Sequence, residues 1–202
     1  MGAARVGLCS LESSWSPGYY GTLKFERWDL RFQNVTKSGG FGHLQKGHGV
    51  AFADLDNDGD QDIYHQLGGF FHGDRFNNTL FLNPGQGNHF LTVKLVGVQS
   101  NRSAFGARIK VVLDTESGTR EVHRAVGSVS SFGGSPFRQE IGLGDATAIR
   151  RLEIYWPRSD IRQVFENVPI DSMIKIIEGE DRYQPLHAPR YDLGQAAAKK
   201  NG

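Results

Sequence analysis

Five carboxylates lie within nine residues between positions 54 and 62, where the chain reads Asp-Leu-Asp-Asn-Asp-Gly-Asp-Gln-Asp. Like charges at such short spacing repel one another, so a folded chain seldom keeps them together unless a cation neutralises them. Carboxylate and carbonyl oxygens are the ligands that Ca²⁺ prefers, and the ion takes about six to eight of them. Gly59 suits the sharp turn that such a loop needs. The segment therefore predicts a calcium-binding loop.

The spacing and the flanks distinguish this loop from an EF-hand. An EF-hand has a bidentate Glu at the last loop position, where this chain has His65. The flanking stretches, residues 49–53 and 63–67, are short and β-prone, so we expect the loop to connect two strands. We predict that the backbone carbonyl of Asp60 is a ligand, with its side chain in solvent. The predicted side-chain ligands are Asp54, Asp56, Asp58 and Asp62. The alternative is a solvated acidic turn, because Asp and Asn are common in turns.

The composition favours strands and argues against several classes of protein. Among 202 residues, 26 are glycine and two are methionine, which is typical of an all-β protein with tight turns. The net charge of +1, with Lys and Arg scattered, argues against a nucleic-acid partner. The single cysteine, Cys9, excludes an intrachain disulfide. No apolar run is long enough to span a membrane, and residues 1–17 lack the pattern of a signal peptide.

Strand signals divide the chain into four parts. Residues 1–24 have little pattern, residues 25–87 contain the acidic loop, residues 88–180 carry regular strand signals, and residues 181–202 form a tail that wraps the surface or is disordered. Seven strands are expected in the third part, at residues 90–98, 107–114, 120–126, 137–143, 151–156, 161–165 and 173–178. Charged and apolar residues alternate within them, which indicates one solvent-facing side. We therefore expect a β-sandwich or barrel-like domain packed with the acidic-loop segment.

Two stretches resemble known families. Residues 47–64, with Asn78-Thr-Leu-Phe-Leu-Asn83, resemble an FG-GAP or VCBS-type repeat, which is one blade of a calcium-binding propeller. Residues 83–180 resemble the ASPIC/UnbV domain, through motifs such as Phe105-Gly-Ala-Arg108, Ile141-Gly-Leu-Gly-Asp145 and Ile154-Tyr-Trp-Pro157. Members of this family are mostly secreted or surface-associated, and their biochemical activity is generally unassigned. The resemblance implies a secreted, periplasmic or cell-surface protein.

A single repeat cannot bury both faces of one blade. Three explanations are open: the chain is a fragment, the repeat packs on the sandwich, or blades are completed between chains. We favour packing on the sandwich, which leaves an exposed sheet edge.

The histidines near the loop suggest an enzymatic alternative. His43, His48, His65, His72 and His89 lie within 47 residues, so they could converge on a transition metal. None shows the spacing of a known metal motif. The alternative function is a metal-dependent hydrolase or lyase acting on a polysaccharide or phosphoester, with the aspartate loop and His48, His65 or His72 as its active site.

Aromatic residues indicate a binding alternative. A sugar ring stacks on an exposed aromatic side chain, and a calcium-stabilised β domain can present such a platform. The candidate platforms are Trp28, Tyr64, Phe70, Phe71 and Trp156, although core packing is the more common role for a tryptophan at a strand end. We predict a non-catalytic, calcium-stabilised β module for adhesion or ligand recognition, with calcium as its cofactor and an extracellular protein or glycan as its partner.

Overall fold

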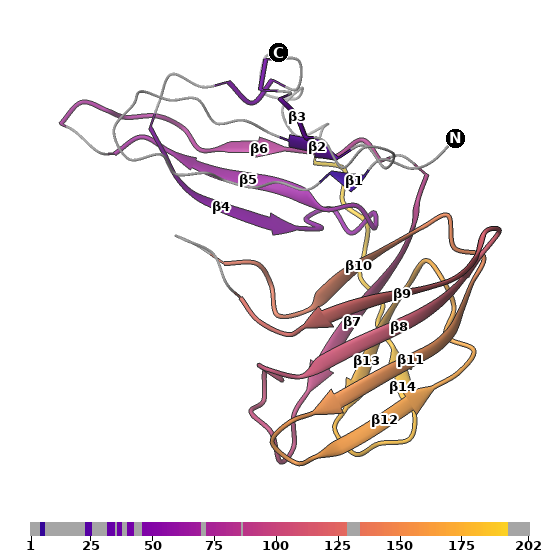
Figure 1. Ribbon diagram of the computed structural model, residues 1–202. Coiled ribbons are helices and arrows are strands. Elements are labelled where there is room, and N and C mark those ends of the chain that lie inside the picture. The colour runs from indigo at the N-terminus through magenta and orange to yellow at the C-terminus, as the bar shows by residue number, and fades with distance from the viewer. Residues whose placement is uncertain are drawn as a thin grey trace. The chain divides into compact units, whose positions relative to one another are not determined.

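A computed structural model describes the backbone at residues 5–6, 23–25, 32–34, 36–37, 40–42, 46–69, 72–85, 87–128 and 134–193. These residues form strands and connecting turns, without a helix (Figure 1). The strands are β1 Arg5–Val6, β2 Leu23–Phe25, β3 Phe32–Asn34, β4 Gly47–Ala53, β5 Asp62–Leu67, β6 Thr79–Phe81, β7 His89–Val96, β8 Arg108–Thr115, β9 Gly118–Ala125, β10 Gln139–Gly144, β11 Ala148–Trp156, β12 Ile161–Phe165, β13 Ser172–Ile177 and β14 Tyr183–Pro185. Within the described ranges, no helix has the length and apolar character needed to cross a bilayer.

Two four-stranded sheets form a β-sandwich. One has the order β10-β7-β13-β14 and the other the order β12-β11-β8-β9. Neighbouring strands are antiparallel except β7 and β13, which run parallel from the pair Leu91 and Ser172 to the pair Val96 and Ile177. The sheets stay open and do not close into a barrel, so the expected all-β class is confirmed as a sandwich.

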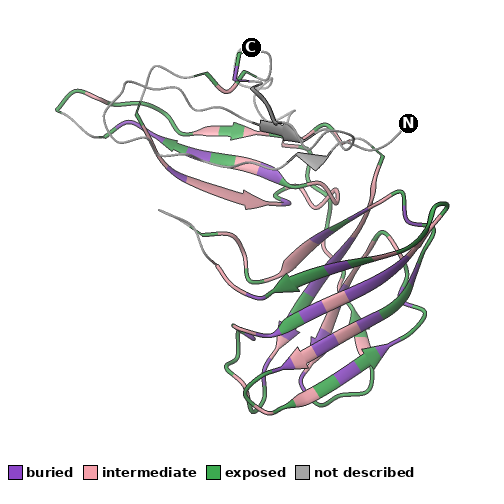
Figure 2. Ribbon diagram, viewed as in Figure 1, coloured by how far each residue is buried: buried purple, intermediate pink, exposed green. Residues whose placement is uncertain are grey.

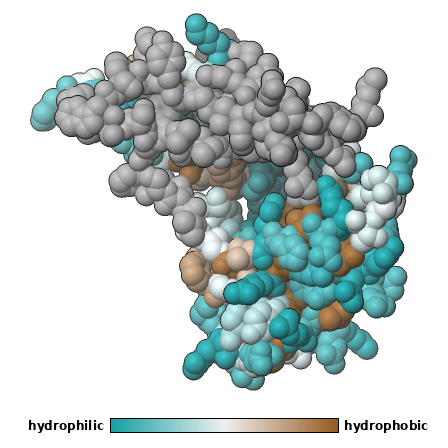
Figure 3. Space-filling model, in the orientation of Figure 1, coloured by the Kyte–Doolittle hydropathy of each residue, from teal (hydrophilic) through white to brown (hydrophobic). Residues whose placement is uncertain are grey.

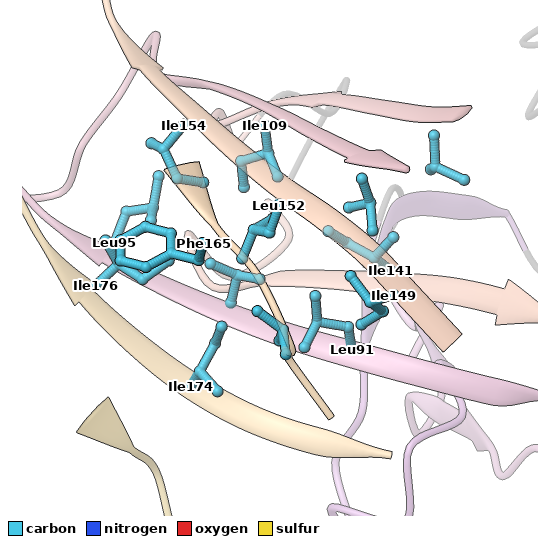
Figure 4. Close-up of a cluster of buried hydrophobic side chains, with 14 of the residues drawn as sticks. Leu91, Leu95, Ile109, Ile141, Ile149, Leu152, Ile154, Phe165, Ile174 and Ile176 are labelled. Carbon is cyan, nitrogen blue, oxygen red and sulfur yellow. The ribbon is translucent and has the colours of Figure 1, made fainter. Parts of the chain in front are cut away.

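The core lies between the two sheets because alternate residues of each strand point inward. Leu91, Ile141 and Ile174 come from one sheet, and Ile109 and Leu152 come from the other (Figure 4). Each is at most 1% exposed. Figure 2 shows the resulting alternation of buried and exposed residues along these strands. Burying each such side chain contributes about 1.5–3 kcal/mol, so this apolar layer is the main source of the stability of the sandwich.

Trp156 belongs to this core, and its predicted role as a surface platform is wrong. Its side chain is fully buried, on the same face of β11 as Leu152 and Ile154. Its indole Nε1 donates a hydrogen bond of 2.5 Å to Oε1 of Gln163, on the neighbouring strand β12. A buried indole whose only donor is already bonded to a core side chain has no ring face left for a sugar.

The chain divides into two compact units. The first contains residues 1–50 and 64–80, and the second contains residues 51–63 and 81–202. Two further sheets have the strand orders β1-β2-β3 and β4-β5-β6. The aspartate loop, residues 54–62, connects β4 to β5 and belongs to the second unit together with the whole sandwich.

Candidate functional site

The aspartate loop is shaped by hydrogen bonds from its own backbone to its own carboxylates. The amides of Asp58 and Gly59 donate to Oδ1 and Oδ2 of Asp54, at 2.9 and 3.1 Å. The amide of Asp60 donates to Oδ1 of Asp58 at 2.9 Å. Short acidic side chains that bond to nearby amides stabilise turns in this way. The sequence therefore curls the loop around Asp54, which is only 2% exposed.

Three of the predicted ligands converge. Asp54, Asp56 and Asp58 each offer a carboxylate oxygen, and these three oxygens lie within 4.8 Å of one another. Oδ1 of Asp56 is buried and has no hydrogen-bond partner among the described residues. A buried oxygen without a donor is costly, so this atom is in a position where a cation would stabilise it.

The electrostatics of the loop follow from burial and crowding. Burial raises the pKa of Asp54 from 3.8 to about 6, although the Gly59 amide opposes this shift; the nearby carboxylate of Glu140 raises the pKa further. Burial, and then the charges of neighbouring aspartates, raise the pKa values of Asp56 and Asp60. Carboxylates that share a site disfavour their own ionised forms, and a bound cation reverses this effect.

Asp62 and Asp60 lie outside the converging group. Asp62 is 1% exposed, and its two carboxylate oxygens accept the amides of Leu55 at 3.0 Å and Asn83 at 2.9 Å. It therefore ties the start of the loop to the segment after β6. Asp60 is partly buried, so its side chain is only partly in solvent. The structure thus separates the five aspartates into three that converge, one that ties backbone segments together, and Asp60, which does neither.

An ion pair next to strand β10 holds the loop from outside. Nε of Arg138 contacts Oε1 of Glu140 at 2.9 Å, and both side chains are largely buried. The Arg138 guanidinium also donates to the backbone carbonyl of Asp54 and to Oδ1 of Asn57. Oε2 of Glu140 accepts the amide of Asp54 at 3.0 Å and Nε2 of Gln61 at 2.9 Å. The pair fixes both ends of the loop to the sandwich.

The C-terminal segment 189–191 supplies a second set of contacts. The carbonyl of Pro189 accepts Nδ2 of Asn57 at 2.8 Å, and the amide of Tyr191 donates to the carbonyl of Asp56 at 2.8 Å. The Arg190 guanidinium donates to the carbonyl of Asp58 at 2.6 Å. Sequence reasoning missed Arg138, Glu140 and Arg190. The only local signal was the Arg138–Glu140 pair at spacing two, which places both side chains on one face of a strand.

The other candidate residues do not join this site. Trp28, Phe70, Phe71 and His43 lie outside the described residues. Tyr64 is 43% exposed, and its hydroxyl accepts Nδ2 of Asn78 at 2.6 Å. Nδ1 of His89 contacts Oδ2 of Asp171 at 2.7 Å. Of the described histidines, which also include His48, His65 and His72, none is part of the aspartate group.

The fold and the loop define a class, namely an all-β sandwich protein that carries a converging group of aspartates. Residues 97–182 match the family model described as ASPIC and UnbV. The matched range contains strands β8 to β13, so the resemblance is confirmed for this part of the sandwich. No curated protein matches the chain. The aspartate loop lies outside the matched residues, and its resemblance to an FG-GAP or VCBS repeat stays a prediction.

Proposed function

We propose that this protein is a non-catalytic, calcium-stabilised β module for adhesion or ligand recognition. The observation that carries the metal part is the convergence of Asp54, Asp56 and Asp58, including a buried Asp56 oxygen without a described hydrogen-bond partner. The donor set fits a hard dication, because every candidate ligand atom is an oxygen. The three side chains would hold the ion, and the carbonyl of Asp60 would add a further oxygen.

The expected effect of the ion is structural. Arg138 and Glu140 hold the loop on the β10 side, and residues 189–191 hold it on the C-terminal side. An ion within the loop would neutralise the crowded carboxylates and fix the segment to which both sets of contacts attach. The bound ion would remove the repulsion between the carboxylates and restrict the conformations of the loop. Because it binds the folded state, it would stabilise the second unit as a whole.

The proposed recognition function and extracellular location rest on the family resemblance and on the calcium concentration that each compartment provides. Extracellular calcium is high enough to fill sites with dissociation constants of roughly 10⁻⁴–10⁻³ M, which intracellular levels leave empty. We therefore propose a secreted, periplasmic or cell-surface location and a protein or glycan partner. The alternative hydrolase or lyase would need histidines near the loop, and the described residues offer no histidine in the aspartate group.

Thermal melting of metal-stripped protein tests the proposal. Selective binding to the folded state raises Tm with ligand concentration, so calcium should raise Tm while magnesium raises it less. Asp56→Asn removes one charge at nearly constant size and should abolish the calcium shift. Asp145→Asn is the matched control, because Asp145 is exposed and outside the loop; this variant should keep the shift. Stabilisation by zinc or manganese without a calcium shift would overturn the proposal and favour the histidine-centred alternative.

A further inference from the structure

The outer face of the sheet β12-β11-β8-β9 carries a row of cationic side chains that the linear sequence does not reveal. The antiparallel register places Arg108 opposite Tyr155, and Tyr155 opposite Arg162. Residues in register on neighbouring strands point to the same side of a sheet. Ile109, Ile154 and Gln163 alternate with this row and face the core, so the row itself faces solvent.

A shallow depression of about 490 Å³ lies over this row and the next. The second row contains Lys110 and Glu153 in register, with His123 on β9 and Val164 on β12 beside them. In Figure 3 this part of the molecule is mostly hydrophilic, with hydrophobic residues between the hydrophilic ones. The depression therefore offers both charged groups and some apolar surface to a ligand.

The two arginines of the first row are available for an anion. Two other cations of this face already form ion pairs. Nζ of Lys110 lies 2.8 Å from Oε1 of Glu121, and Nη2 of Arg151 lies 2.8 Å from Oε1 of Glu153. Arg108 and Arg162 are exposed, and neither has a carboxylate within 4 Å among the residues that the structure describes. Cζ of Arg162 lies 4.3 Å from the centre of the Tyr155 ring. A guanidinium stacked in this way keeps its in-plane N–H groups free, and these match a carboxylate or sulfate.

We propose that this face binds an acidic polysaccharide, with Arg108 and Arg162 contacting carboxylate or sulfate groups of the sugar chain. Arg108 and Arg162 stand two strands apart, which is about 10 Å at the usual strand spacing. The spacing suits anionic groups separated by a neutral stretch, as in a chain of alternating acidic and neutral sugars. In the second row, Glu153 contacts Arg151 through Oε1, and its Oε2 can accept a hydrogen bond from a sugar hydroxyl.

The mixed charge of the face favours such a glycan over nucleic acid. Duplex DNA carries a phosphate charge about every 1.7 Å. Because Lys110 and Arg151 are already paired with Glu121 and Glu153, Arg108 and Arg162 are too few to neutralise so dense a row of charges. An acidic polysaccharide has lower charge density and many hydroxyl donors, and it complements both signs. This inference names a partner for the recognition function proposed above and rests on it, but it uses a site distinct from the aspartate loop.

Binding of defined polymers to the full chain tests the inference. The probes are hyaluronan, in which carboxylate-bearing sugars alternate with neutral ones, and chondroitin sulfate, which also carries sulfates; dextran is the neutral control and duplex DNA the competing polyanion. Isothermal titration in calcium-containing buffer should show binding to one or both acidic polysaccharides that weakens as salt increases. Binding to hyaluronan identifies carboxylate as sufficient, and binding to chondroitin sulfate alone identifies sulfate.

Arg108→Gln and Arg162→Gln should each weaken that binding about tenfold, since each removes a charged hydrogen-bond donor. Arg182→Gln makes the same charge change in the turn between β13 and β14 and should leave the affinity within about twofold. Absence of binding to both acidic probes, DNA binding at least as tight, or equal losses in Arg182→Gln would each overturn the inference.

The same variants separate this inference from the metal proposal. Arg108→Gln and Arg162→Gln should keep the calcium-induced rise in Tm, because neither residue contacts the aspartate loop in the described structure. Unchanged glycan affinity in these variants, with a calcium shift that Asp56→Asn abolishes, would refute the glycan surface alone. Loss of glycan binding in these variants, without any calcium shift in the parent protein, would refute the metal proposal alone.

Discussion

The aspartates of the loop have different structural roles because their surroundings differ. Asp54 and Asp62 are almost fully buried and accept backbone amides with both oxygens, so they organise the chain. Asp56 keeps an oxygen without a described donor. Asp54 combines the two roles, because it also belongs to the converging group, whereas Asp62 only organises the chain. The acidic pattern alone does not distinguish these roles.

Gly59 is a residue whose substitution should be costly. Its φ is +101°, and a Cβ at this position would lie 2.3 Å from ring carbons of Phe90. Gly59→Ala combines backbone strain with overpacking, so we expect the free energy of unfolding to fall by about 2–4 kcal/mol. Urea denaturation measures the loss. Gly118→Ala is the control, because its φ is +121° and no atom lies within 4 Å; it should lose only about 1–2 kcal/mol. Equal losses would show that the contact with Phe90 has no effect.

Glu178 should make stability depend on pH. Burial raises the pKa of its carboxyl, but hydrogen bonds from the Ser159 hydroxyl and from the amide and hydroxyl of Ser100 outweigh burial and, with the Val98 amide, lower the pKa from 4.5 to about 2. A depressed pKa contributes stability above about pH 4.5 that is lost as the pH falls towards 2. The loss should amount to about 3 kcal/mol.

Glu178→Gln isolates this effect. The amide cannot accept all of these hydrogen bonds with a charge, so the variant should be less stable at pH 7 and should show a flatter pH dependence between pH 5 and 2. Urea titrations at several pH values across that range give the change in the free energy of unfolding with pH. Glu116→Gln changes an exposed turn residue and should follow the parent protein. A Glu178→Gln profile parallel to that of the parent would contradict the assignment.

At the scale of elements, the strands were predictable and their partners were not. The expected strand at 161–165 coincides with β12, and those at 90–98 and 107–114 differ by at most two residues at each end from β7 and β8. Alternation of charged and apolar residues is local, so it is visible in the sequence. The parallel pairing of β7 with β13 joins segments about eighty residues apart, and no local pattern encodes it.

The Arg138–Glu140 pair should be a strong link between β10 and the aspartate loop. Arg138→Met leaves the Glu140 carboxylate, whose side chain is 5% exposed, without its cation. Breaking a buried pair on one side costs about 3–5 kcal/mol, and part of that loss should appear as weaker calcium binding. Chemical denaturation with and without calcium measures both the loss in the free energy of unfolding and the weaker calcium binding. Arg150→Met breaks the exposed pair with Asp114, which has a 2.6 Å contact, and should cost less than about 1 kcal/mol. Similar losses in the free energy of unfolding for the two variants would show that the Arg138–Glu140 pair is not a strong link between β10 and the aspartate loop.

At the scale of the whole molecule, the candidate site combines local and distant parts. The spacing of Asp54, Asp56 and Asp58 was sufficient to predict their convergence, because they lie within a single loop. Arg138 and Arg190 contact that loop from about eighty and one hundred and thirty residues away. The expected tail at 181–202 begins with β14, which pairs with β13 and packs Tyr183 against the core, so this part belongs to the sandwich. Residues 189–191 contact the aspartate loop through backbone groups and one arginine rather than an apolar face. Contacts of this kind leave no periodic signal.

The segment 189–191 should therefore increase calcium affinity by ordering the loop. A truncation after Ala188 removes the hydrogen bonds to Asp56, Asn57 and Asp58. Each exposed hydrogen bond contributes about 0.5–1 kcal/mol, so we expect affinity to fall about tenfold. Loss of the Arg190 charge acts in the opposite direction, because a cation beside the loop opposes a second one, but this exposed charge is largely screened at physiological salt.

Two further proteins complete that experiment. A truncation after Leu193 removes none of these contacts and should bind calcium within about twofold of the full chain. Arg190→Gln removes the charge and the guanidinium hydrogen bonds, while the bonds from Asn57 Nδ2 to the Pro189 carbonyl and from the Tyr191 amide to the Asp56 carbonyl remain. Its calcium affinity should lie between those of the two truncations and be nearest to that of the full chain at low salt. The affinity should fall towards that of the truncation after Ala188 as salt screens the benefit of removing the charge. If both truncations bound calcium equally, the loop would be ordered without the C-terminal segment, and the Arg138–Glu140 pair would be its principal support.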